Sequence, residues 1–217
     1  MPRRAHLLLL LVTVLTLGMA APALAGSARD ETIAERSVLN EDDVAAYDLS
    51  PTSGSDDLPP NVTACKKIRA LSRAADRRPQ AESQFADDLG TNAFSRVIVY
   101  PNARAAKASV LAYSTDTGVD CLNATLERDL DASLADGSTA EFTGEALEVR
   151  LGDSSIVYQI VVTVTDDEGG VGEIYLELGL VQVGRGLAQL AFQAQGEPFP
   201  GSEDLATIVI DNMESNL

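Results

Sequence analysis

The chain has 217 residues, of which 33 are Asp or Glu and 16 are Lys or Arg, so its formal net charge is −17 at pH 7. An acidic surface of this kind repels the phosphates of nucleic acids and the anionic headgroups of membranes, so we expect no nucleic-acid partner and consider a membrane surface a poor one. The same charge favours solubility and, among partners, cations or basic proteins. The length suits a single domain with its own core.

The N-terminus has the pattern of a secretory signal peptide. Two arginines precede an apolar run over residues 7–21, and the tripeptide at 23–25, Ala-Leu-Ala, matches the small–x–small cleavage pattern. The apolar run is too short to span a bilayer comfortably. Ser27 stands where a lipoprotein signal requires cysteine, which favours release over lipid attachment. We therefore expect residues 1–25 to be removed and the protein to be secreted, extracellular or in the cell envelope, with no stable membrane span.

The two cysteines and the single histidine limit the chemistry of the mature chain. In an exported protein, an even count favours one disulfide between Cys65 and Cys121, worth about 4 kcal/mol for so long a loop. A reactive or metal-binding pair is the alternative, but neither cysteine has a CxxC partner. His6 is the only histidine and leaves with the signal peptide, which removes histidine triads and His-ligated zinc sites. We expect no enzyme activity, no cofactor and no metal.

Along the chain, residues 26–36 are small and charged without periodicity and predict a disordered leader, so we place the domain at 37–217. A stretch rich in Pro, Gly, Ser and Asp at 50–60 predicts a loop. Apolar residues at helical spacing predict helices over 61–75, 103–113 and 119–134, with Asn102 as the N-cap of the second and Ser202 as the N-cap of a last helix. Because both cysteines fall on predicted helices, the disulfide would join one helix to another.

Alternating apolar residues predict about six strands. They cover residues 81–89, 93–100, 139–151, 154–167, 171–183 and 187–195. Short glycine-rich turns separate several of these strands, and short turns join antiparallel neighbours. We therefore predict an α+β fold, in which one antiparallel sheet packs against helices.

Several short segments together resemble a known family. They are an N-terminal VLNEDDV, PNARAAKASVLAY followed by DCL, the strand beginning with GD, the hairpin LVQVGRGLAQLAF and the final LATIVI. In this order, with a cysteine in the first helix, the chain resembles the PknH-like extracellular sensor domains of actinobacterial membrane Ser/Thr kinases and related envelope proteins. It departs from the kinases in having no kinase domain and no transmembrane helix, and in having a single cysteine pair. The resemblance implies an envelope domain that binds a ligand or partner, and it carries over no catalytic residues.

The candidate ligand-binding residues are four aromatic residues on predicted strands: Tyr100, Tyr158, Tyr175 and Phe192. Ordinary core packing is the alternative for each. Arg185, in the turn GRG, is expected to be an exposed turn residue, with an anionic ligand as the alternative. The acidic stretches at 129–137 and 166–170 suggest calcium loops, but solvated turns are favoured because the first lacks the EF-hand Gly and Glu. A carboxylate pair could still hydrolyse glycosides, but aromatic residues for a sugar cleft are few.

Two functions follow from these observations. The first is a non-catalytic sensor-like domain that binds a small molecule, lipid or envelope component in a cleft between sheet and helices. The alternative is a protein-interaction module of the cell envelope that acts through an exposed sheet face or the acidic surface.

Overall fold

The structure, a computed structural model, describes residues 28–52, 70, 73–134, 137–147 and 149–217. The helices are α1 (Ala28–Ser37), α2 (Glu41–Val44), the 3-10 helix η2 (Ala45–Tyr47), α4 (Ala103–Tyr113), α5 (Asp116–Ser133) and α6 (Ser202–Asn216). The strands are β1 (Ser50–Pro51), β2 (Gln80–Ala86), β3 (Asn92–Val99), β4 (Thr139–Leu147), β5 (Ser154–Thr165), β6 (Val171–Val183) and β7 (Gly186–Gln195).

All the strands belong to one antiparallel sheet with the order β1-β2-β3-β7-β6-β5-β4. This confirms the α+β class and the antiparallel sheet. The sheet has seven strands where the sequence predicts about six. The additional strand is β1, which pairs Ser50 with Ala86 and Pro51 with Phe85 at the start of the predicted loop.

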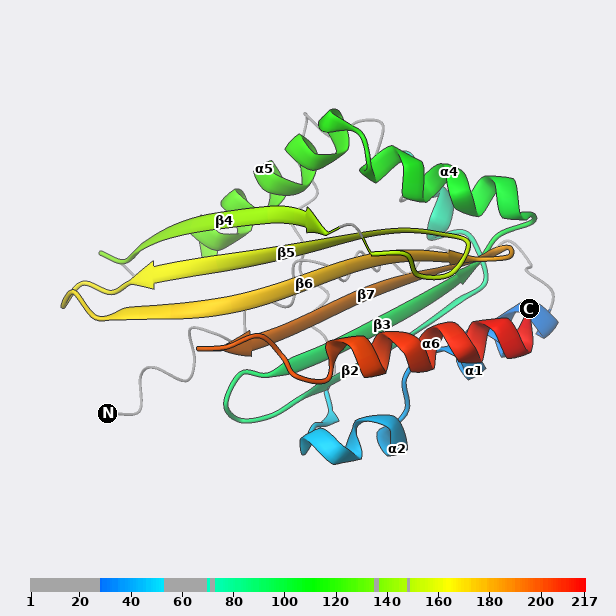
Figure 1. Cartoon of the computed structure of the whole chain (residues 1–217), viewed down its shortest axis with the longest axis horizontal. Coiled ribbons are helices and arrows are strands. Elements are labelled where there is room, and N and C mark those ends of the chain that lie inside the picture. Colours follow the sequence, from blue (N-terminus) through cyan, green and yellow to red (C-terminus); the bar gives the residue numbers. More distant parts are fainter. Residues whose placement is uncertain (1–27, 53–69, 71–72, 135–136, 148) are drawn as a thin grey trace.

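Helices cover both faces of the sheet, and Figure 1 shows the two groups on opposite sides. Alternate residues of a strand point to opposite faces. On β3, Ile98 packs with residues of α4, and its neighbour Val97 packs with residues of α6. We call the two sides the α4/α5 face and the α6 face; α1 and α2 share the latter.

The two faces of the sheet have separate apolar cores. On the α6 face, Val97, Ala188 and Phe192 pack with α6 residues such as Leu205 and Val209. On the α4/α5 face, α4 covers Ile98 and Leu187, while α5 covers the middle of β5 and β6. Every residue of β3 is buried, because helices lie on both its faces.

Helix α1 corrects the expectation of a disordered leader over 26–36, since residues 28–36 are helical. Ile33 and Ala34 are buried against Val99 of β3, and Ser37 is also buried. The Arg185 guanidinium holds the Asp30 carboxylate through both oxygens, at 2.6 and 3.1 Å. Local composition gives no indication of this helix, because the residues that hold it lie in distant parts of the chain.

The two predicted N-caps have different outcomes. The Asn102 side chain accepts a hydrogen bond from the Ala105 N–H at 3.0 Å and caps α4, as predicted. Ser202 is instead the first residue of α6, and Gly201 is the N-cap without a side-chain hydrogen bond. The Ser202 hydroxyl donates to the Glu177 carboxylate at 3.0 Å, so a contact with β6 replaces the predicted cap.

Some predictions fall outside the described residues. These are the signal peptide at 1–25, most of the helix at 61–75, and Cys65. Cys121 is buried on α5, and its pairing with Cys65 remains a prediction. Among the helices that the structure describes, none combines the length and apolar character that crossing a bilayer requires.

Candidate functional site

Polar side chains interrupt the apolar layer on the α4/α5 face where β3 lies beside β7. The register pairs Asn92 with Gln193 and Arg96 with Gln189. The pairs between and beyond them are apolar: Phe94 with Ala191, and Ile98 with Leu187. Two polar pairs therefore alternate with two apolar pairs across the middle of the sheet.

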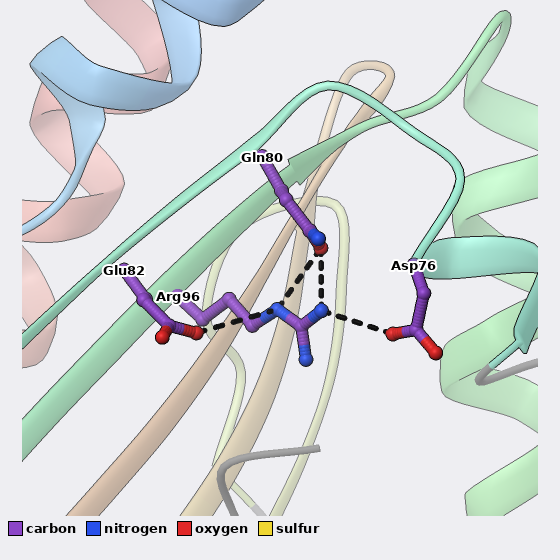
Figure 2. Close-up of polar contacts among 4 residues, drawn as sticks. All are labelled: Asp76, Gln80, Glu82 and Arg96. Atoms are coloured by element: carbon purple, nitrogen blue, oxygen red, sulfur yellow. Dashed lines mark hydrogen bonds and ion pairs between the residues drawn. The ribbon is translucent and has the colours of Figure 1, made fainter. Parts of the chain in front are cut away.

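Arg96 is the most unusual of these residues, because its side chain is fully buried. Its Nη2 donates to Asp76 Oδ1 at 3.1 Å, and its Nε donates to Gln80 Oε1, also at 3.1 Å. The Glu82 carboxylate lies 4.0 Å from Nε and is half exposed. Figure 2 shows the guanidinium reaching between Asp76 and Gln80, with Glu82 near Nε.

These contacts explain how a charge is tolerated at this position. Removing a guanidinium from water is costly unless a paired carboxylate and further hydrogen bonds satisfy it. Asp76 supplies the opposite charge from the turn that precedes β2, and Gln80 supplies an acceptor from the strand beside β3. Arg96 thereby fixes the connection between the residues before β2 and the centre of the sheet.

Two tyrosines complete this polar region. The Tyr100 hydroxyl forms a hydrogen bond of 3.0 Å with the Ser109 hydroxyl on α4. Burial raises the pKa of Tyr100, while the bond to Ser109 lowers it in part. Burial also raises the pKa of Tyr113 to about 12, with a further increase from Tyr100 and an opposing effect of Arg96. Tyr113 is the last residue of α4, the helix that also carries Ser109.

Gln189 provides a buried acceptor at the same place. Its Oε1 is excluded from solvent and has no hydrogen-bond partner among the described residues. A buried acceptor without a partner costs about 1–3 kcal/mol. Gln182 Oε1 is in the same state among the described residues. The amide nitrogens of Gln193 and Asn92 both donate to the Gly90 carbonyl, at 3.1 and 3.4 Å.

We name this group the Arg96 cluster; its members are Asp76, Gln80, Arg96, Tyr100, Tyr113 and Gln189. It combines a fixed ion pair with phenol hydroxyls and an amide acceptor. Such a set can hold a polar group through hydrogen bonds. The described residues contain no group of three or more His, Cys, Asp or Glu side chains that could hold a metal ion.

The four aromatic candidates divide between the two faces of the sheet. Tyr100 and Tyr158 lie on the α4/α5 face, where the Tyr158 hydroxyl donates to the Tyr113 carbonyl at 2.8 Å. Tyr175 lies on the other face and donates to Glu173 at 3.0 Å. Phe192 is buried on the α6 face, where its ring stacks on Phe199. The four side chains therefore do not face one another across one cleft.

The charged turns also take definite roles. Arg185 is not simply an exposed turn residue, because it anchors α1 through Asp30. In the acidic turn at 166–170, Asp166 Oδ1 accepts hydrogen bonds from the N–H groups of Glu168 and Gly170, as in an Asx turn. This carboxylate therefore stabilises its own turn, which is the solvated-turn role that the sequence favours.

Sequence reasoning did not select Arg96, Tyr113 or Gln189 as site residues. One signal was present for Arg96. It lies between Phe94 and Ile98 on the same face of a predicted strand, where an apolar residue is expected. No comparable signal marks Gln189. Its importance depends on the register between β3 and β7, which local sequence does not reveal.

Comparisons with known proteins support the fold. No protein family matches the chain, and no curated protein matches it. Among solved structures, the fold is similar to that of the extracellular domain of PknH from Mycobacterium tuberculosis, with a TM-score of 0.52 over 85% of this chain and 96% of that one. The sequences are 13% identical, so the likeness concerns the fold alone. It confirms the part of the expected resemblance that concerns architecture.

Proposed function

We propose that the protein is an exported, non-catalytic sensor-like domain that binds a small molecule, lipid or envelope component between its sheet and the helices α4 and α5. The observation that carries this proposal is the buried Gln189 acceptor, which lies beside the ion pair of Arg96 and has no partner in the part of the chain that the structure describes. The similarity of the fold to an extracellular domain supports the exported location.

The chemistry of the Arg96 cluster favours recognition over a purely structural role. A buried ion pair adds little stability compared with apolar residues of the same size. A carbonyl oxygen left without a partner lowers stability further. A ligand with a hydroxyl or amide donor would satisfy Gln189, and the Tyr113 hydroxyl offers a second polar contact at the same cluster. Of the aromatic candidates, Tyr100 and Tyr158 lie on the side where such a ligand would bind.

Native mass spectrometry of the protein purified from its own host tests this function. We expect a reproducible small-molecule adduct on the wild type and on Tyr175→Phe, the matched change on the opposite face. Gln189→Met and Tyr113→Phe should lower the fraction that carries the adduct. A bare mass for the wild type in every preparation would contradict the proposal.

Export to an oxidising compartment and a Cys65–Cys121 disulfide are part of the same proposal. Removal of residues 1–25 gives a mature N-terminus at Gly26, which N-terminal sequencing of the secreted protein identifies. Reduction should raise the intact mass by about 2 Da, the two hydrogens gained by one cystine. An unchanged mass would show free thiols and contradict the disulfide.

A second candidate function is a protein-interaction module, and the open part of the α6 face favours it. Helix α6 packs on β6 and β7 and does not extend over β4 and β5. The odd-numbered residues from Thr139 to Glu145 are exposed on this side of β4, among them Glu141. In the same experiment, a bare mass together with a reproducibly co-purified protein would support this function.

A further inference from the structure

Strand β4 forms an open edge of the sheet. It is the last strand in the order, and no described strand pairs with its outer side. The four consecutive residues 143–146 are exposed, although successive residues point to opposite faces. An edge strand presents unpaired N–H and C=O groups that can bind another extended segment.

At the opposite edge of the sheet, a short strand covers only the end of β2. There, β1 consists only of Ser50 and Pro51, and proline cannot donate to a neighbouring strand. With nine residues and no described strand on its outer side, β4 is the longer open edge of the described sheet.

The side chains of β4 define what this edge could accept. Thr139, Glu141, Thr143 and Glu145 alternate with residues of the other face and are all exposed. Glu141 and Glu145 lie four residues apart, about 13 Å along a strand. Neither carboxylate makes a hydrogen bond or ion pair with another described residue in the structure.

The neighbouring glutamates on the same face are already engaged. Glu173 accepts from Tyr175, and Glu177 accepts from Ser202. Glu141 and Glu145 lie on the edge strand itself and are exposed, so both carboxylates can meet the cations of a partner that pairs with this strand. Val161 of β5 pairs with Thr143 and is half-buried, which adds apolar surface beside the strand.

We propose that β4 binds an extended segment of a basic partner protein, which adds a strand to the sheet and places Lys or Arg side chains, four residues apart, against Glu141 and Glu145. Main-chain hydrogen bonds would supply affinity, and the two carboxylates would select the partner. This inference deepens the second candidate function and rests on it.

A second copy of this chain fits the edge poorly. Antiparallel pairing of two β4 strands about Thr143 would bring Glu141 of one copy opposite Glu145 of the other. Like charges directly opposite on paired strands are destabilising, and each chain carries a formal charge of −17. Charge complementarity thus selects a basic partner over self-association.

Fluorescence anisotropy with synthetic peptides tests the docking strand. The probe is a labelled peptide of Thr and Val with lysines at every fourth position. One comparison peptide carries glutamates in their place, and another keeps the lysines but has prolines between them. We expect the first to bind and both others to fail, because a proline-containing segment cannot complete the strand pairing.

Matched variants separate the edge from general electrostatics. Glu141→Gln with Glu145→Gln should weaken binding of the lysine peptide about tenfold. Glu197→Gln with Glu214→Gln, which changes exposed glutamates elsewhere by the same net charge, should leave it within about twofold. Equal weakening by both pairs, binding of the proline peptide, or no binding of the lysine peptide would overturn the proposal.

Failure of this inference can be told apart from failure of the interaction function. If a protein co-purifies from the host with the wild type and equally with Glu141→Gln/Glu145→Gln, the protein is an interaction module but β4 is not its docking strand. If nothing co-purifies, the interaction function itself fails.

Discussion

Strands β3 and β4 lie in the same sheet and have similar lengths, yet their environments are opposite. Every residue of β3 is buried, including Asn92, Ser95 and Arg96, whereas most of β4 is exposed. Ser95 accepts from the Leu39 N–H at 2.9 Å and bonds the Ser83 hydroxyl at the same distance. A polar side chain at the centre of the sheet is thus tied to other elements, while the glutamates of the edge strand remain available.

The difference teaches that position in the sheet, more than residue type, decides what a polar side chain does here. At the centre, helices on both faces exclude bulk water, so a polar group there is costly unless the protein or a bound molecule supplies a partner. At the edge, solvent satisfies the side chains and they can serve recognition. Polar groups of β3 and of its neighbour β7 should therefore govern stability, and those of β4 should not.

Arg96→Ala is expected to be the most damaging change and gives the strongest test of this contrast. It leaves the Asp76 carboxylate and Gln80 without their donor and opens a cavity. We expect a loss of about 3–5 kcal/mol in the free energy of unfolding, measured by urea denaturation. Glu141→Ala on β4 should change it by less than about 0.5 kcal/mol.

A double variant separates the charge from the packing. Arg96→Met with Asp76→Leu removes both charges and should recover a large part of the loss, since apolar groups can replace a buried ion pair. A double variant as unstable as Arg96→Ala would show that the loss comes from the hydrogen bonds of the guanidinium and not from a charge left on Asp76, because methionine keeps the length of the arginine stem.

Phe192 and Tyr175 extend the comparison to the α6 face, where one is covered and the other is not. Phe192→Ala removes a buried ring that stacks on Phe199, and should cost about 3–4 kcal/mol. Tyr175→Ala, on the part of the face that α6 leaves open, should cost less than about 1 kcal/mol. Thermal and urea unfolding of both variants measure the difference, and similar losses would contradict the distinction between covered and open parts.

Much of the fold follows from local sequence signals. The strands β2–β7 lie close to their predicted positions, and α4 begins at its predicted cap, because alternation and capping act over a few residues. Helix α1 could not be predicted this way, since Asp30 is held by Arg185 from the β6–β7 turn. The same holds for β1, whose two residues are a strand only because β2 lies beside them.

The candidate site was less accessible to sequence reasoning. The candidate ligand-binding residues were chosen because they are aromatic residues on strands, and this criterion grouped Tyr158 with Tyr175, although the two point to opposite faces of the sheet. The alternation within β6 did indicate where Tyr175 points. Ile174 and Leu176, on either side of it, are the buried apolar residues, so Tyr175 faces the other way. The pairing of Arg96 with Gln189, however, depends on strand order, and only the assembled sheet shows it.

The alkaline limit of stability tests the polar layer at the centre. Burial raises the pKa of Tyr113 to about 12, from 10.0 in the unfolded chain. Between these values the unfolded state releases a proton that the folded state keeps, so stability present below pH 10 is lost as the pH rises towards 12. The contribution is about 3 kcal/mol at most. Tyr113→Phe should flatten this alkaline decline in urea midpoints, and Tyr175→Phe should alter it less.

The smallest expected effect has the opposite sign. Gln189→Met replaces a buried acceptor, which has no partner among the residues that the structure describes, with an apolar group of similar length. It should raise the free energy of unfolding by about 1 kcal/mol. Gln193→Met, on the same strand and face, also removes the bond from its amide nitrogen to the Gly90 carbonyl, and should therefore be less stable than Gln189→Met by about 1 kcal/mol. Chemical denaturation of ligand-stripped protein compares the two variants. A loss for both would mean that Gln189 is as well satisfied as Gln193, and the chemical case for binding at the Arg96 cluster would fail.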